Sequence, residues 1–230
     1  MKKLVDLINK QKKKKIRNVI DGKIKDFSDL GRNLIRNLSR NLDDETIKDD
    51  IFKELCFCIL TANFQAGKSI IIQKEIGDGF LTLTEKQLAA ELRKLGHRFP
   101  NMRAKYIVEA RKHKNDLIDM LNSKKTDQEK REWIVNNIKG LGMKESSHFL
   151  RNIGHQNLAI LDFHIINLLV EHGIVERQYK NKQSNKPKSL TKKKYSDIEN
   201  KLSLLCEKTD LTQSEMDLYL WYLETGKVLK

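Results

Sequence analysis

The sequence predicts an all-α protein. It contains only two prolines, Pro100 and Pro187, and no long stretch shows the strict apolar–polar alternation of a half-buried strand. Apolar residues recur instead at helical spacing, and glycines separate the predicted helices. With 230 residues and 39 % hydrophobic content, the chain can bury a sizeable core in one large domain or two small lobes.

The chain is strongly basic. Lysine and arginine number 45 against 31 acidic residues, and the formal net charge of +14 favours a polyanionic partner. There is no run of 18 apolar residues, and no apolar signal-peptide core follows the basic N-terminus. We therefore expect a cytoplasmic protein without a membrane partner.

The N-terminal residues 1–26 are rich in lysine and include a run of four. This composition predicts a basic arm. Leu4, Leu7 and Ile8 can nevertheless line one face of a helix, so a packed helix is the alternative.

Residues 49–61 form an apolar segment whose hydrophobic face is too wide for a surface helix, which predicts a central core helix. The three cysteines, Cys56, Cys58 and Cys206, lack the paired spacing of a zinc or iron–sulfur site. All three lie among apolar residues at helical spacing, so we expect them to be small core residues.

Four further helices are expected before the most informative segment of the chain. The first runs from about residue 68 to Gly77, the second is capped by Thr84, and the third covers 101–114. Asp127 is the expected cap of the fourth helix, which leads directly into a glycine-containing turn.

That turn is the segment Ile138-Lys139-Gly140-Leu141-Gly142-Met143-Lys144, and another helix follows it over about residues 143–152. Gly140 and Gly142 remove side chains that would keep a phosphate away, so backbone N–H groups at the start of the second helix can bind it. Lys139 adds positive charge. The helix, hairpin and helix together predict DNA binding that does not depend on base sequence.

Lys144 falls in the first turn of the second helix, whose positive end disfavours an ammonium and favours the nucleophilic free amine. Attack on C1′ of a deoxyribose can displace the base and form an imine, after which proton loss at C2′ releases the 3′ phosphate. Asp162, about one helix and one turn further on, can stabilise the positive charge on the sugar. The alternatives are a phosphate-contacting Lys144 in a purely DNA-binding hairpin and an Asp162 that only caps the next helix.

The C-terminal part contains a basic segment and an aromatic helix. Residues 180–194 contain seven lysines and almost no apolar groups, which indicates an exposed linker or a DNA-facing loop. A helix over residues 214–224 follows and includes Trp221, and the sequence then continues to Lys230.

These motifs resemble the helix-hairpin-helix DNA glycosylase superfamily and, within it, the archaeal type-2 8-oxoguanine DNA glycosylase/lyase family. The resemblance runs from about Asp49 to Lys230. Its blocks are residues 58–63, 96–100, 138–154, 161–164 and 218–230. The iron–sulfur branch of the superfamily has four closely spaced cysteines near the C-terminus, where this chain has only Cys206, so the resemblance does not extend to that branch.

The resemblance implies a two-lobed fold with DNA and the active site in the cleft between the lobes. The terminal-helix lobe is expected to combine residues 27–60 and 156–230, and the helical-barrel lobe to span 61–155, with the helix-hairpin-helix motif at about 127–153. By motif, Lys144 is the Schiff-base nucleophile and Asp162 assists it. Lys139 stands where many hairpins of the superfamily have proline, and this departure leaves the glycines and Lys144 in place.

An enzyme that acts at C1′ of duplex DNA extrudes the nucleotide and holds its base by stacking and hydrogen bonds. Trp221 is the best stacking candidate, and Phe99 or Met102 can cover the other face of the base. Ordinary core packing is the alternative for each. The resemblance assigns the C-terminal lysine, here Lys230, to recognition of 8-oxoguanine, and a terminal carboxylate can accept hydrogen bonds from a guanine edge.

Four more residues are candidates because of their places in the chain. Asn63 and Gln65 follow an apolar helix and can either fill a gap in the duplex or cap a helix. For His97 and His164 a buried, hydrogen-bonded ring is the expected state, because no metal-ligand spacing surrounds them. His164 is also a candidate DNA contact.

No redox or organic cofactor is expected. Hairpins of this class can bind a structural monovalent cation through backbone carbonyls, here those of Asn136, Ile138 and Leu141. Such an ion would stabilise the hairpin and would not take part in the reaction.

The leading hypothesis is a bifunctional DNA repair enzyme that excises 8-oxoguanine and cleaves the strand 3′ to the abasic site. We expect a monomer that acts on double-stranded DNA at the nucleoid. Two alternatives remain open, a non-catalytic DNA-binding module and a glycosylase for another damaged base.

Overall fold

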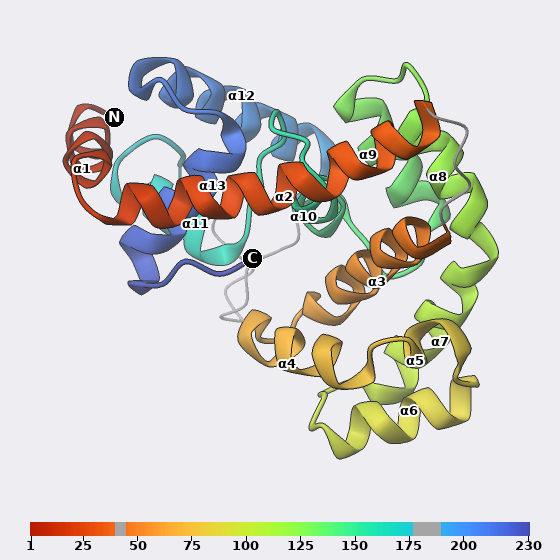
Figure 1. Ribbon diagram of the computed structural model, residues 1–230. Helices are drawn as coiled ribbons and strands as arrows, with labels where there is room; N and C mark the ends of the chain where they lie inside the picture. The colour runs from red at the N-terminus through yellow and green to blue at the C-terminus, as the bar shows by residue number, and fades with distance from the viewer. Residues whose placement is uncertain (40–44, 177–189) are drawn as a thin grey trace. The chain divides into compact units, whose positions relative to one another are not determined.

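The computed structural model describes residues 1–39, 45–176 and 190–230, and within these ranges every regular element is a helix (Figure 1). The prediction of an all-α protein is confirmed. None of the described helices is both long and apolar enough to cross a membrane. The chain divides into two compact units, Met1–Lys25 with Gln156–Val228 as unit 1, and Asp26–His155 with Leu229–Lys230 as unit 2.

Unit 1 contains the N-terminal helix α1 (Lys2–Lys12), which packs against α12 (Lys192–Thr209) and α13 (Gln213–Thr225). Leu4, Ile8 and Ile20 are fully buried. Residues 1–26 are therefore not a free basic arm, because their apolar face buries against the C-terminal helices and leaves most of the lysines in solvent. The other elements of unit 1 are the start of α2 (Ile16–Ser39) and all of α11 (Phe163–Glu171).

Unit 2 is built around α3 (Glu45–Thr61), which contacts five other helices. They are α4 (Ala66–Ile76), α5 (Gly79–Thr82), α7 (Pro100–Ala110), α8 (Lys114–Asn122) and α10 (Met143–Asn152). From Ile51 to Thr61 every residue except Lys53 is buried, which confirms the predicted core helix. The predicted assignment of residues 27–60 to the terminal-helix lobe is wrong, since this helix is the core of unit 2. Unit 2 also contains the part of α2 from Asp26 onward, α6 (Glu85–Lys94), η1 (Arg111–His113) and α9 (Asp127–Asn137).

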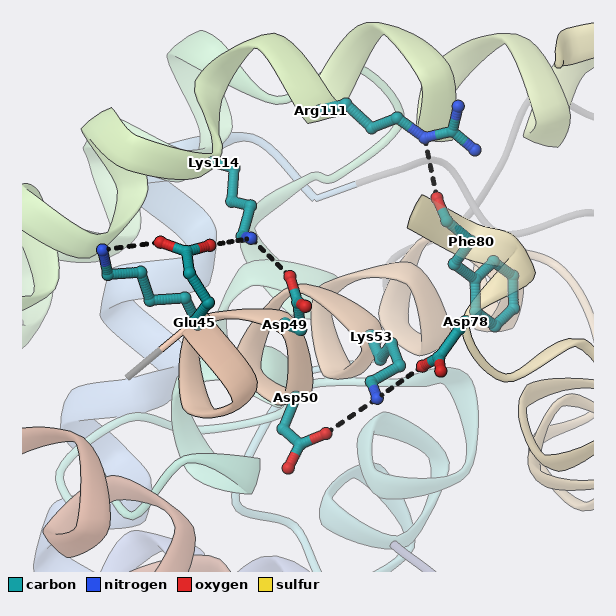
Figure 2. A network of polar contacts seen from close by, with 9 residues as sticks. Glu45, Asp49, Asp50, Lys53, Asp78, Phe80, Arg111 and Lys114 are labelled. Carbon is teal, nitrogen blue, oxygen red and sulfur yellow. Dashed lines mark hydrogen bonds and ion pairs between the residues drawn. The ribbon is translucent and has the colours of Figure 1, made fainter. Parts of the chain in front are cut away.

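The polar N-terminal half of α3 is held by ion pairs on two sides (Figure 2). On one side, the Lys114 ammonium pairs with Asp49 and lies 2.9 Å from Glu45, and its hydrogen bond lowers the pKa of Glu45. On the other, Lys53 lies 2.8 Å from Asp50 and 3.0 Å from Asp78. These contacts connect α3 to α8 and to the turn before α5.

Helix boundaries follow the predicted caps with two differences. Thr84 caps α6 as predicted, and the structure shows that it forms a capping box with Gln87. The expected helix over 101–114 is α7 followed by η1, and α8 begins where that helix was expected to end. The cap of α9 is Thr126, whose hydroxyl accepts the Glu129 N–H, rather than Asp127. Lys192 begins α12, so the last three residues of the predicted 180–194 loop are helical, and 180–189 lie outside the described residues.

The cysteines are core residues, as predicted. Cys56, Cys58 and Cys206 are free and buried. Burial raises the pKa of all three thiols, that of Cys206 to about 12. They are therefore held as neutral thiols and are poor nucleophiles.

Candidate active site

The glycine hairpin joins α9 and α10 in unit 2. Ile138 and Leu141 are 2 % and 5 % exposed and anchor the turn in the core, whereas Gly140 and Gly142 are exposed. The Leu141 N–H donates to the Ile138 carbonyl at 3.4 Å. The turn thus combines apolar anchors with a bare backbone surface that suits a phosphate.

Gly140 cannot be replaced without strain. Its φ is +90°, and a Cβ added there would lie 2.5 Å from Cδ2 of the Tyr106 ring. Gly142, the N-cap of α10, has φ −96°, and its added Cβ would meet only a Glu145 carboxylate oxygen at 3.5 Å. The close approach of α7 to the hairpin therefore requires a glycine at 140 but not at 142.

We expect Gly140→Ala to lower the free energy of unfolding by about 1–3 kcal/mol, because it adds a left-handed alanine and a clash with the Tyr106 ring. Gly142→Ala is the matched control and should cost less than about 1 kcal/mol. Urea denaturation of both variants measures the difference. Equal losses in the two would contradict this account of the hairpin.

Lys144 lies in the first turn of α10, with a side chain that is 27 % exposed and an Nζ 3.3 Å from Oε1 of Glu145. Lys139, by contrast, is 67 % exposed and its Nζ lies 3.1 Å from Glu109. The two hairpin lysines therefore differ in setting. The partly enclosed Lys144 suits a reactive amine, and the solvated Lys139 suits an electrostatic contact.

One turn along α10, the buried ring of His148 packs edge-on against Phe57 with centroids 5.6 Å apart. Burial lowers the pKa of His148 well below its usual range, and the charges of Arg151, Lys144 and Lys230 lower it further, while a hydrogen bond to the Lys230 backbone opposes them. The ring is thus held neutral beside two lysines. Its Nε2 has no hydrogen-bond partner among the residues that the structure describes.

The neutral His148 makes stability depend on pH. Because the folded pKa is lowered, the unfolded chain binds the extra proton first, so stability is complete above the ordinary histidine pKa and declines as pH falls below about 6.5. We expect urea denaturation to show a loss approaching 1.4 kcal/mol per pH unit from this group. His148→Gln should flatten that slope, and the same change at the 37 % exposed His113 should not. Identical slopes in all three proteins would contradict this prediction.

The end of α3 and the loop after it are fixed by hydrogen bonds from the segment before α7 and from α7 itself. His97 is buried and hydrogen-bonded as predicted, with Nε2 3.0 Å from the Leu60 carbonyl and Nδ1 accepting the Phe99 N–H at 3.0 Å. Burial lowers its pKa. The Arg103 guanidinium donates to the Ala62 carbonyl. Both hydrogen bonds reach backbone carbonyls, so they fix the last turn of α3 and the start of the loop.

Asn63 and Gln65 are exposed on this loop, and Asn63 has φ 58°. Gln65 occupies the N-cap position of α4, yet its side chain makes no capping hydrogen bond, so capping is not its role. Met102 is 51 % exposed, which excludes core packing. Phe99 is partly exposed, with the Arg98 guanidinium 5.0 Å from its ring centroid. All four candidates leave surface available to a ligand.

The remaining candidates lie in unit 1. Asp162 caps α11, where its Oδ1 accepts the Ile165 N–H at 2.9 Å. The His164 side chain is 45 % exposed, 3.6 Å from Glu224, so the expected burial of this ring is wrong. His164 and the partly exposed Trp221 meet edge-to-face with centroids 5.0 Å apart. The N-terminus of α11 thus lies beside the aromatic face of α13.

The structure brings Lys144, His148 and Lys230 together in unit 2, since both lysines act on the same imidazole. Sequence reasoning missed His148 and also Glu54, a buried carboxylate that pairs with Lys230. The sequence did contain a signal for Glu54, because it is the single acidic residue in the apolar run 51–60. In the described part of the chain, no group of three or more His, Cys, Asp or Glu residues could hold a metal ion. The cation on the hairpin carbonyls stays a prediction.

The sequence matches a family of known proteins over most of its length. The Ogg-HhH family, described as 8-oxoguanine DNA glycosylase, matches residues 33–211. A Korarchaeum cryptofilum protein named 8-oxoguanine DNA glycosylase/AP lyase is 48 % identical over 199 residues, covering 86 % of this chain and 91 % of its own length. One of the same name from Methanocaldococcus jannaschii is 46 % identical over 227 residues, 99 % of each chain.

Solved structures agree with these matches. The Methanocaldococcus jannaschii 8-oxoguanine glycosylase/lyase in complex with 15mer DNA containing 8-oxoguanine superposes with a TM-score of 0.86 at 44 % identity, over 99 % of each chain. The 8-oxoguanine DNA glycosylase of Thermotoga maritima gives 0.84 at 37 % identity, over 100 % of this chain and 99 % of that one. The protein therefore belongs to the Ogg-HhH family of 8-oxoguanine DNA glycosylases.

Proposed function

We propose that this protein excises 8-oxoguanine from duplex DNA and cleaves the strand 3′ to the resulting abasic site. The observation that carries the proposal is the position of Lys144, a partly enclosed amine in the first turn of α10 directly after the phosphate-binding hairpin. Relatives that are 46–48 % identical are named 8-oxoguanine DNA glycosylase/AP lyase, and they support the choice of base.

Base release begins when the Lys144 amine attacks C1′ of the extruded nucleotide. The bond from C1′ to N9 breaks, and the base leaves with the electron pair and takes up a proton. The Asp162 carboxylate stabilises the positive charge that develops on the sugar. Opening of the sugar ring then gives an imine between Lys144 and C1′.

Strand cleavage follows from the same imine. Loss of a proton from C2′ delivers electrons that break the bond from C3′ to its oxygen, and the 3′ phosphate leaves. Water then hydrolyses the imine and returns Lys144 to its amine form. One lysine therefore serves both the glycosylase and the lyase steps.

DNA is held by contacts of two kinds in this proposal. The hairpin N–H groups at Gly140 and Gly142, together with Lys139, bind phosphate without reading sequence. The proposed duplex contacts are Asn63, Gln65 and His164, and the proposed base pocket comprises Trp221, Phe99, Met102 and Lys230. A protein with this activity works on chromosomal DNA, so we propose that it acts in the cytoplasm at the nucleoid. We also propose that it acts as a monomer.

Single-turnover assays on a panel of duplexes test the proposal. The panel contains 8-oxoguanine, other damaged bases, a preformed abasic site and undamaged DNA. We expect base release from 8-oxoguanine and strand cleavage at both 8-oxoguanine and the abasic site. Tight binding with no base release over hours would instead indicate a non-catalytic module, and preferential release of another base would change the substrate.

A further inference from the structure

A buried carboxylate lies in the centre of unit 2. Glu54 is 6 % exposed and sits within the apolar run of α3. A carboxylate in such a setting is costly unless other groups pair with it. The groups that pair with the Glu54 carboxylate therefore indicate its role.

Three side chains from different segments meet the Glu54 carboxylate. Asn152 of α10 donates from Nδ2 to Oε1 at 2.5 Å, and Gln73 of α4 donates from Nε2 to Oε2 at 3.2 Å. The Lys230 ammonium lies 2.6 Å from Oε2. The two amides fix the direction of the carboxylate, and the lysine supplies the opposite charge.

The Lys230 ammonium is enclosed on a second side by an aromatic ring. Its Nζ lies 4.4 Å from the centroid of Phe57, one turn of α3 from Glu54. An ammonium between a carboxylate and an aromatic face is strongly localised. The Lys230 ammonium is therefore held by groups of unit 2 and is not available to bind a phosphate.

The ion pair between Glu54 and Lys230 holds the last two residues of the chain in unit 2. Leu229 and Lys230 belong to unit 2, whereas the preceding segment, Gln156–Val228, belongs to unit 1. Lys230 is also close to the reactive end of α10, because its charge and that of Lys144 both act on the His148 ring and on the Cys58 thiol. The pair with Glu54 thus holds Lys230 beside the amine to which we assign the chemistry.

We infer that Glu54 is a positioning residue for base excision, which holds Lys230 at the base-binding side of the Lys144 site through the buried ion pair. The inference rests on the proposed function. A pair that only stabilised the fold would support every activity of the protein equally. A positioning pair affects the step in which a base is recognised more than cleavage at a site that has already lost its base.

The experiment compares Glu54→Gln and Lys230→Met with the unchanged protein on two duplexes, one with 8-oxoguanine and one with a preformed abasic site. We expect the ratio of base release to abasic-site cleavage to fall by about 10²-fold in each variant, the size of effect seen when a reacting group is misplaced. Because the two residues act as one unit, the double variant should fall no further than the worse single variant. Lys230→Arg keeps the charge and should recover most of the ratio.

Lys227→Met is the matched control, since it makes the same change at an exposed lysine three residues earlier. Thermal melting measures whether each variant folds. If Glu54→Gln does not fold, Lys230→Met alone tests the inference. An unchanged ratio in folded Lys230→Met, or an equal loss of both activities, would overturn the inference. Failure of the unchanged protein on both duplexes would instead refute the proposed function.

Discussion

Lys144→Gln should abolish covalent trapping of the protein on 8-oxoguanine duplex by borohydride and should lower base release and strand cleavage by at least about 10³-fold. Glutamine keeps most of the side-chain volume but has no amine to form the imine. The Lys144 side chain is 27 % exposed and its Nζ lies 3.3 Å from Glu145, so the fold should tolerate the change. Gel analysis of trapped complexes and single-turnover rates provide the measurements.

Lys139→Gln is the control for this experiment, because it makes the same change in the same hairpin. Lys139 is more exposed than Lys144 and lies against Glu109. We expect it to weaken DNA binding, with a shallower salt dependence by about one unit of log–log slope or less, while trapping persists. Trapping that survives in the Lys144 variant and disappears in the Lys139 variant would exchange the two assignments.

Asp162→Asn should lower 8-oxoguanine release by about 10²–10³-fold while the protein keeps its fold. Asp162 has two roles in our proposal, capping of α11 and stabilisation of positive charge on the sugar. Asparagine is as good an N-cap as aspartate, so its side-chain oxygen can still accept the Ile165 N–H. The substitution therefore removes the charge alone, and single-turnover base release measures its effect.

Asp162→Ala separates the two roles, because it removes the cap as well as the charge. It should lose about 1 kcal/mol of stability, measured by urea denaturation, in addition to the loss of base release. Full base release by the asparagine variant would show that Asp162 is only a cap. That outcome is the alternative that the sequence left open.

Elements with local signals were predicted well. The wide apolar face of α3 identified a core helix, and Thr84 marked the start of α6. An error arose where competing signals stood close together. Thr126 caps α9 although the adjacent Asp127 is an equally good capping residue by type.

In the candidate site, too, the residues with local sequence signals were predicted and those that depend on distant contacts were not. The hairpin and Lys144 could be read directly, because the glycines and the lysine are adjacent in the chain. Glu54 could not be connected to Lys230, which lies 176 residues away, because local spacing says nothing about such a pair. The neutral charge state of His148 could not be predicted either, since it depends on burial against Phe57 from another helix.

The sequence alone determined the helical class, the hairpin, its lysine and the family resemblance, because each depends on neighbouring residues whose order is the signal. Only the tertiary structure decided that residues 1–25 pack as part of unit 1, that α3 is the core of unit 2, and that Glu54 anchors Lys230. The physical reason is burial. The cost of an unpaired carboxylate and the gain from covering an apolar face depend on which distant segments meet.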